Sequence, residues 1–166
     1  IDNFAEYSKP IGSEIWTLSH NSQGFAAHPV YHDGVVYAVS SDFEDGTLWA
    51  IDSATGEVLW TVDDVGDTQA VSPIVFEDLV VLGSANISAL RAFSAETGRQ
   101  VWSTNMVSTM LNTGAVTANG ILFVSDTFRS LKAVDIFSGK VLGQYPLSNL
   151  STSGIVVVPG KVIVAD

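Results

Sequence analysis

The 166-residue chain contains no cysteine, and this absence excludes several chemistries at once. Disulfide bonds, thiolate nucleophiles, cysteine-ligated zinc sites and iron–sulfur clusters all require a residue that this sequence lacks. Any stabilising or catalytic device must therefore be built from packing, hydrogen bonds and the remaining polar side chains.

Basic residues and long apolar runs are also scarce. Seven Lys and Arg residues stand against eighteen Asp and Glu residues, which gives a formal net charge of −11. A chain with this charge repels phosphate backbones and anionic lipid surfaces, so we predict no nucleic-acid partner. The longest apolar stretch, residues 155–165, is interrupted by Pro159, Gly160 and Lys161 and is too short to cross a bilayer. We therefore predict no membrane insertion. The first residues also lack the basic and apolar regions of a signal peptide, so we expect a processed or trimmed chain.

No apolar pattern with helical period persists over ten residues, and the pattern that is present belongs to strands. Hydrophobic residues make up 46% of the chain and charged residues 15%, which is enough apolar surface to form a core. Val, Ile, Tyr, Phe and Thr gather in short runs bounded by Gly, Asp, Asn and Pro, as in Leu48–Asp52 and Leu131–Asp135. The sequence therefore predicts an all-β protein.

These runs belong to an internal repeat. Glycine followed four residues later by tryptophan occurs at Gly12/Trp16, Gly56/Trp60 and Gly98/Trp102, and a fourth copy at Gly139 has lost the tryptophan. The four glycines are spaced 44, 42 and 41 residues apart. This period is typical of the four-stranded blades of a β-propeller.

We predict an incomplete β-propeller of four-stranded antiparallel blades, with about three full blades and partial ones at both ends. The expected blades cover residues 26–62, 70–104 and 113–146, and a partial blade covers residues 153–166. Residues 14–18 are expected to form the outer strand of a preceding or closing blade. An arc of this kind would expose apolar blade faces, so we expect it to belong to a larger propeller.

Each repeated residue type has a predicted structural role. A tryptophan covers the junction between neighbouring blades, a glycine allows the left-handed backbone of a turn, and an aspartate caps that turn. An alanine is expected to make room for the indole of the next blade. The residues assigned to these roles are Trp16, Ala50, Asp52, Gly56, Trp60, Ala92, Gly98, Trp102, Ala133, Asp135 and Gly139.

The segment Ala50-Ile-Asp52-Ser-Ala-Thr55-Gly56-Glu-Val-Leu-Trp60 resembles the tryptophan-docking motif of the pyrroloquinoline-quinone (PQQ)-like, quinoprotein/BamB-type β-propeller repeat family. The second copy departs from the motif at Ser94, and the third departs at Ser138 and Gly143. The resemblance implies a propeller in the periplasm or outside the cell. It leaves two activities open, because the family includes PQQ-dependent dehydrogenases as well as scaffolds without a cofactor.

Candidate ligand-binding residues are few. The loops expected at one mouth of the propeller axis contain Gln69, Asn112 and Arg129, which are candidates for holding a cofactor. No catalytic residue can be assigned, and no Gly-x-Ser-x-Gly motif supports a hydrolase. The remaining polar clusters are interpreted as surface turns. His28 and His32, with His20 nearby, lack a third metal ligand, and Asp42–Gly46 lacks the alternating oxygen ligands of a calcium loop. Asp63, Asp64 and Asp67 lie in a connection between blades, where they form a surface loop or face the axial opening.

The favoured hypothesis is a non-catalytic propeller module that binds or scaffolds proteins, with no cofactor and no metal. The alternative is a segment of a PQQ-dependent alcohol or sugar dehydrogenase, which would use PQQ and calcium and keep its catalytic residues elsewhere. A sensor domain would require flanking sequence. The predicted partner is another protein or a second copy of the chain. In the second case, residues 14–18 of one copy would complete the blade that residues 153–166 of the other begin.

Overall fold

In the computed structural model, the residues that can be described are 13–19, 24–25, 27–42, 44–67, 72–84, 87–106, 111–116, 119–126, 129–148 and 155–164. Every regular element within these residues is a β-strand, arranged in antiparallel sheets. The predicted all-β class with four-stranded blades is therefore confirmed. In the same ranges no helix is long and apolar enough to cross a membrane.

The first sheet has an interrupted innermost strand, because β1 (Gly24–Phe25) and β2 (Val30–His32) both pair with β3 (Val35–Ser41). The sheet continues outward through β4 (Gly46–Asp52) to β5 (Val58–Val62). The second sheet runs in the same way through β6 (Ile74–Phe76), β7 (Leu79–Ser84), β8 (Ala89–Ser94) and β9 (Gln100–Asn105).

The third sheet is formed by β10 (Leu111–Val116), β11 (Ile121–Asp126), β12 (Ser130–Asp135) and β13 (Val141–Pro146). A two-stranded sheet of β14 (Ile155–Val158) and β15 (Lys161–Val164) follows. Each sheet thus pairs strands in chain order, which is the meander of a propeller blade.

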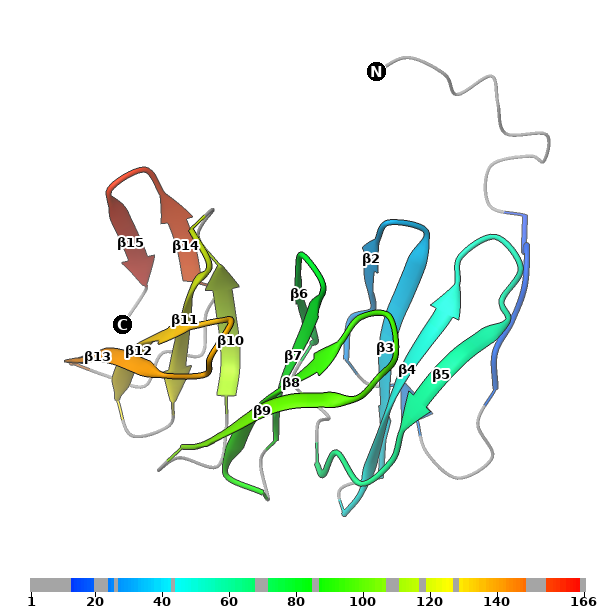
Figure 1. Cartoon of the computed structure of the whole chain (residues 1–166), viewed down its shortest axis with the longest axis horizontal. Helices are drawn as coiled ribbons and strands as arrows, with labels where there is room; N and C mark the ends of the chain where they lie inside the picture. Colours follow the sequence, from blue (N-terminus) through cyan, green and yellow to red (C-terminus); the bar gives the residue numbers. More distant parts are fainter. Residues whose placement is uncertain are drawn as a thin grey trace.

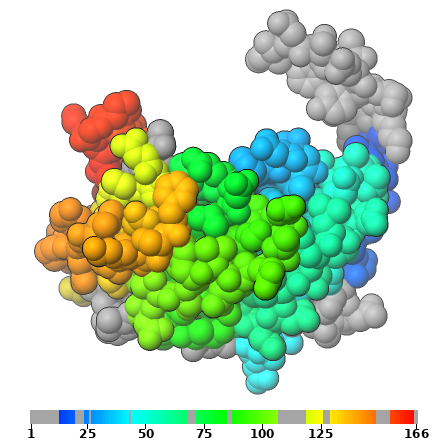
Figure 2. Space-filling view, in the orientation of Figure 1, coloured from blue at the N-terminus to red at the C-terminus, as the bar shows by residue number. Residues whose placement is uncertain are grey.

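The sheets stand side by side along an arc (Figure 1). Figure 2 shows them as consecutive blocks from the blue and cyan first sheet to the red β14–β15 hairpin. Two apolar cores lie between the sheets. One joins the first and second sheets through residues such as Tyr37, Leu48 and Phe93. The other joins the second and third sheets through residues such as Leu90, Leu122 and Ile136.

Tight turns at one edge of the arc set the strand register. Asp33 and Gly34, with φ of 45° and 84°, join β2 to β3 in the two-residue turn that fits the twist of a hairpin. Gly120 and Gly160 also have positive φ in the corresponding turns of the later sheets. Each turn therefore fixes which residues of its two strands lie opposite each other, and so which side chains face the core.

Residues 14–18 were predicted as the outer strand of a preceding or closing blade. The segment 13–19 is described throughout, yet it is not assigned to a strand. A strand requires ladder hydrogen bonds to a neighbouring strand, and none of the described strands pairs with this segment. The first sheet begins at Gly24, the second at Ile74, the third at Leu111 and the hairpin at Ile155, beside predicted blade starts of 26, 70, 113 and 153.

Candidate functional site

The turn between β4 and β5 shows how the repeat builds a blade junction. The Asp52 carboxylate accepts hydrogen bonds from the Thr55 hydroxyl and from the backbone N–H groups of Ala54 and Thr55, at 2.8–3.0 Å. These donors hold the pKa of Asp52 below its usual value, and the Thr55 hydroxyl has the largest effect. The Gly56 N–H then bonds back to the Asp52 carbonyl, and Gly56 adopts a φ of +76°. The turn is therefore capped by its own first residue.

The other two copies keep this turn despite their substitutions. In the second, the Ser94 hydroxyl replaces the carboxylate and accepts the Thr97 N–H at 3.3 Å. In the third, Asp135 accepts from the Ser138 N–H and hydroxyl and from the Phe137 N–H, which lowers the pKa of Asp135. Serine at position 138 thus supplies the same hydroxyl as threonine at the corresponding position of the first copy.

A tryptophan lies over the glycine of each turn. Trp16 covers Gly56, Trp60 covers Gly98, and Trp102 covers Gly139. Each indole N–H also donates a hydrogen bond to a backbone carbonyl of the same turn, at 2.8–3.0 Å; the acceptors are Ser53, Ala95 and Ile136. A buried indole needs such an acceptor. Each tryptophan therefore contacts the turn of the following blade through both its ring and its N–H group.

Close approach explains why the turn residue is glycine. A Cβ atom at Gly98 would lie 2.8 Å from Trp60 Cε3, and one at Gly139 would lie 2.5 Å from Trp102 Cε3. Real Cβ atoms do not approach other heavy atoms so closely. The positive φ of both residues adds a second penalty for any side chain.

The alanines make room for a different indole from the one expected. Ala50 lies directly opposite Trp60 on the neighbouring strand, and Ala92 lies opposite Trp102. Directly opposed residues in antiparallel strands project from the same face of the sheet. The alanines are therefore small because of the indole of their own blade, and the prediction that they accommodate the next blade's indole is wrong. In the third sheet Ala133 faces Gly143, where the tryptophan has been lost.

Arg91 forms a junction contact that the sequence analysis missed. Its guanidinium group donates to the carbonyl of Val65 at 2.6 Å and to that of Asp64 at 3.4 Å, both in the segment that follows the first sheet. Burial lowers the pKa of Arg91. Lys132 occupies the equivalent position in the third sheet and is only 5% exposed. The signal in the sequence was a basic residue between the buried leucine and alanine of the second and third repeats, at the position that Trp49 occupies in the first.

The structure describes only one of the three axial candidates fully. Gln69 lies outside the described residues, and Asn112 is described only through the backbone of β10. Arg129 is exposed, has a φ of +59°, and accepts the Leu147 N–H with its carbonyl oxygen.

The histidine and acidic clusters form turns and surfaces. His20 lies outside the described residues, whereas His28 is exposed and His32 lies 3.6 Å from the carboxylate of its neighbour Asp33. Asp42 accepts two backbone N–H groups of its own turn, which lowers its pKa, and Asp63 accepts the Thr47 hydroxyl. The residues that the structure describes contain no group of three or more His, Asp or Glu side chains that could hold a metal.

A family model described as "Outer membrane protein assembly factor BamB" matches residues 2–91 and 86–166. The two matches cover almost the whole chain, and the repeating sheets agree with them. The chain belongs to the PQQ-like, BamB-type β-propeller repeat family.

Two curated relatives match different extents of the chain. The chain is 23% identical to outer membrane protein assembly factor BamB of Francisella tularensis, over 81% of this chain and 29% of the relative. It is 36% identical to methanol dehydrogenase [cytochrome c] subunit 1 of Methylorubrum extorquens, over 35% of this chain and 11% of the relative. The chain thus spans less than a third of the length of either relative.

Solved structures support the same fold. BamB from Moraxella catarrhalis superposes with a TM-score of 0.70 at 16% identity, over 84% of this chain and 43% of that chain. The computationally designed protein Ika4 superposes with a TM-score of 0.72 at 19% identity, over 93% of this chain and 98% of that chain. At these identities the likeness shows the fold alone.

Proposed function

We propose that this chain is a non-catalytic propeller module that binds proteins outside the cytoplasm, in the assembly of outer membrane proteins. The observation that carries this proposal is the breadth of the similarity to the assembly factor. It extends over 81% of the chain, whereas the similarity to the dehydrogenase is limited to 35%.

The described residues support a binding role through their surface. Exposed apolar side chains recur at the position just before each tryptophan or its replacement, in segment 13–19 and on the outer strands β5, β9 and β13; they are Ile15, Leu59, Val101 and Leu142. An apolar side chain exposed at the same position of every repeat offers a partner protein a regular series of contacts.

The second candidate function is that of a segment from a PQQ-dependent alcohol or sugar dehydrogenase. The local identity of 36% to the methanol dehydrogenase subunit favours it. When bound, PQQ would supply the redox chemistry. Arg129, the one axial candidate with a described side chain, would bind an anionic group of PQQ.

Two binding measurements separate these functions. In the first, the intrinsic fluorescence of the four tryptophans is followed while PQQ is added with and without calcium. We expect no saturable quenching. Saturable quenching that is lost in Arg129→Ala, with Arg99→Ala as the matched control on the opposite edge of the arc, would establish the dehydrogenase alternative instead.

In the second measurement, the chain is immobilised and the purified outer-membrane assembly complex of its host is passed over it. We expect saturable binding that is weakened by Leu59→Glu or Val101→Glu, because a charge would enter the repeated apolar surface. Binding that neither substitution affects would contradict the proposed surface. The absence of any binding would contradict the proposed function.

A further inference from the structure

The charged residues are distributed very unevenly along the arc. Residues 13–67, which include the first sheet, contain ten Asp and Glu residues and no Lys or Arg. Residues 111–164, which include the third sheet and the last hairpin, contain two acidic and four basic residues. The net charge of −11 is therefore concentrated at one end, and the other end has a small positive charge.

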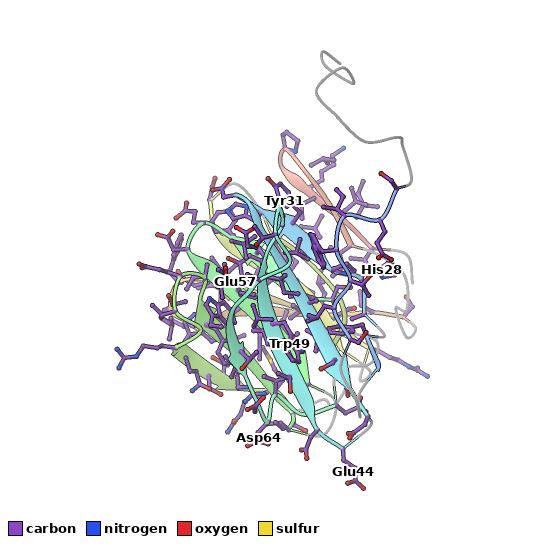
Figure 3. All side chains as sticks on the ribbon, turned by 90° about the vertical axis from the view of Figure 1, so that its right-hand side faces the viewer. His28, Tyr31, Glu44, Trp49, Glu57 and Asp64 are labelled. Carbon is purple, nitrogen blue, oxygen red and sulfur yellow. The ribbon has the colours of Figure 1, made fainter. Side chains whose placement is uncertain are left out.

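The acidic end carries an aromatic sheet face that none of the described sheets covers. Leu48 and Ala50 belong to the core shared with the second sheet, so Trp49 between them projects from the opposite face of β4. Figure 3 shows Trp49 in the middle of this face, with Tyr31 above it. The Phe25 ring lies 6.1 Å from the Trp49 ring, and Phe25, Tyr31 and Leu59 are exposed.

Acidic side chains surround this face. Glu57 lies beside it, and Glu44 and Asp64 lie at its lower edge (Figure 3). All three are exposed. An apolar centre with a charged rim is the usual anatomy of a protein interface. Next to it, segment 13–19 is fixed to the first sheet by Trp16 and exposes Ile15.

The opposite end of the arc has complementary properties. The β14–β15 hairpin exposes Val156, Val158 and Ile163, and within the described chain β15 pairs only with β14. Its inner strand β14 packs on β10 and β11. Exposed Lys161 lies at the tip of the hairpin, and exposed Lys140 lies at the turn before β13.

We propose that two copies of this chain associate head to tail. The β14–β15 hairpin of each copy would pack against the aromatic face of the other copy's first sheet, around Trp49, Phe25 and Tyr31. Both contacts would then be identical and related by a two-fold axis, so the assembly would close as a dimer. Each contact would bury apolar side chains on both partners and bring the basic end of one copy to the acidic end of the other. This inference does not rest on the proposed function.

The pattern of the internal junctions supports this geometry. Between the first and second sheets, and between the second and third, apolar faces meet in continuous cores. The head-to-tail contact would bring two apolar sheet faces together in the same way, one from each copy. Segment 13–19, held on the first sheet by Trp16, would lie beside the partner's hairpin as part of the same blade.

The test is the solution mass of the 166-residue chain, measured by light scattering during size-exclusion chromatography across a dilution series. We expect twice the chain mass of 17.6 kDa. Because the contact joins opposite charges, the dissociation constant of the dimer should rise when NaCl is raised from about 0.05 M to about 0.5 M. A monomer at all concentrations, or open-ended higher oligomers, would overturn the proposal.

Two variants locate the contact. Ile163→Glu puts a charge on the apolar hairpin and should raise the dimer dissociation constant roughly tenfold or more. Val101→Glu is the matched control, because Val101 is 52% exposed on the middle sheet and Ile163 is 53% exposed. It should leave the dimer intact.

A third variant, Lys161→Glu, tests the charge contribution and should weaken the dimer more at low salt than at high salt. Circular dichroism confirms that each variant retains its strands. A dimer that resists Ile163→Glu, or that Val101→Glu disrupts equally, would overturn the proposal, since the contact would lie elsewhere.

Discussion

The Trp16/Gly56 and Trp60/Gly98 junctions have nearly the same contact geometry but different support. In both, the indole lies against the glycine and its N–H donates to a turn carbonyl, at 2.8 Å and 3.0 Å. Trp60 belongs to β5, which is paired with β4 in a four-stranded blade. Trp16 belongs to segment 13–19, which pairs with no described strand.

The comparison separates the local geometry of the docking contact from the stability that the surrounding sheet and core add to it. The capped turn and its glycine provide a flat surface and a carbonyl acceptor, and any tryptophan that reaches them can dock. The stability gained depends on what holds the tryptophan in place. Trp60 is supported by a sheet, by the core between the first two sheets and by a ring contact of 5.9 Å with Tyr37. Trp16 is held mainly by the docking contact itself.

The largest expected effect is that of Trp60→Ala, which should destabilise the chain by about 3–5 kcal/mol. It removes an indole from the junction of two blades and leaves the Ala95 carbonyl without one of its two donors. Urea unfolding followed by circular dichroism measures the change. A loss below about 1 kcal/mol would refute the docking role of this residue.

Gly98→Ala should cost about 2–4 kcal/mol, because left-handed strain and a clash with the Trp60 ring add together. The matched control is Gly34→Ala. Gly34 also has a positive φ, of 84°, but no atom lies within 4 Å of its added Cβ. Gly34→Ala should therefore cost only about 1–2 kcal/mol. Equal losses in urea unfolding would show that the indole contact does not constrain position 98.

Trp16→Ala should cost only about 1–2 kcal/mol, within the usual range for a single substitution. The sequence predicts residues 14–18 as an end strand, and the structure gives Trp16 a partner on its own chain, at Ser53 and Gly56. The same unfolding experiment measures the difference from Trp60→Ala. If the two variants lose the same free energy, support from the sheet does not matter.

The smallest effect is a pH dependence of the turn caps. The Thr55 hydroxyl and backbone donors lower the pKa of Asp52 in the folded state below its ordinary value of 3.8. The stability from this cap is therefore fully present above pH 3.8 and is lost as the pH falls through the lower folded-state pKa. Asp52→Asn keeps an acceptor oxygen but does not titrate.

Thermal unfolding of both proteins between about pH 5 and pH 2.5 tests this expectation. The wild type should lose more stability than Asp52→Asn over the acidic part of this range. Asp135 provides an independent repeat of the experiment, since its pKa is lowered by the same kind of donors. Parallel curves for wild type and variant would show that the carboxylate form of Asp52 is not favoured by folding.

The fold was predictable from the sequence because its signals are local. The alternation in Leu48–Asp52 and Leu131–Asp135 indicated strands, and these segments lie in β4 and β12, respectively. Asp33-Gly34 indicated a hairpin turn, and both residues have the positive φ that this turn requires. Even the substitution at Ser94 was tolerated, because a hydroxyl can accept the Thr97 N–H in place of a carboxylate.

The direction of contacts between elements was less predictable. Ala50 faces the indole of its own blade because of the register between β4 and β5, which spacing in the sequence does not reveal. Arg91 binds the Val65 carbonyl of the preceding connection, and the two residues are 26 positions apart. Both contacts depend on how sheets and loops meet in space.

The sequence by itself determined the repeat, the strands, the glycine turns and their caps. Each of these depends on side-chain alternation, backbone strain or hydrogen bonds over a few residues. Only the tertiary structure decided which turn each tryptophan covers, that segment 13–19 docks without forming a strand, and that the acidic and basic ends of the chain lie at opposite ends of an arc. These features arise when sheets stack, because stacking brings together residues that the local sequence leaves independent.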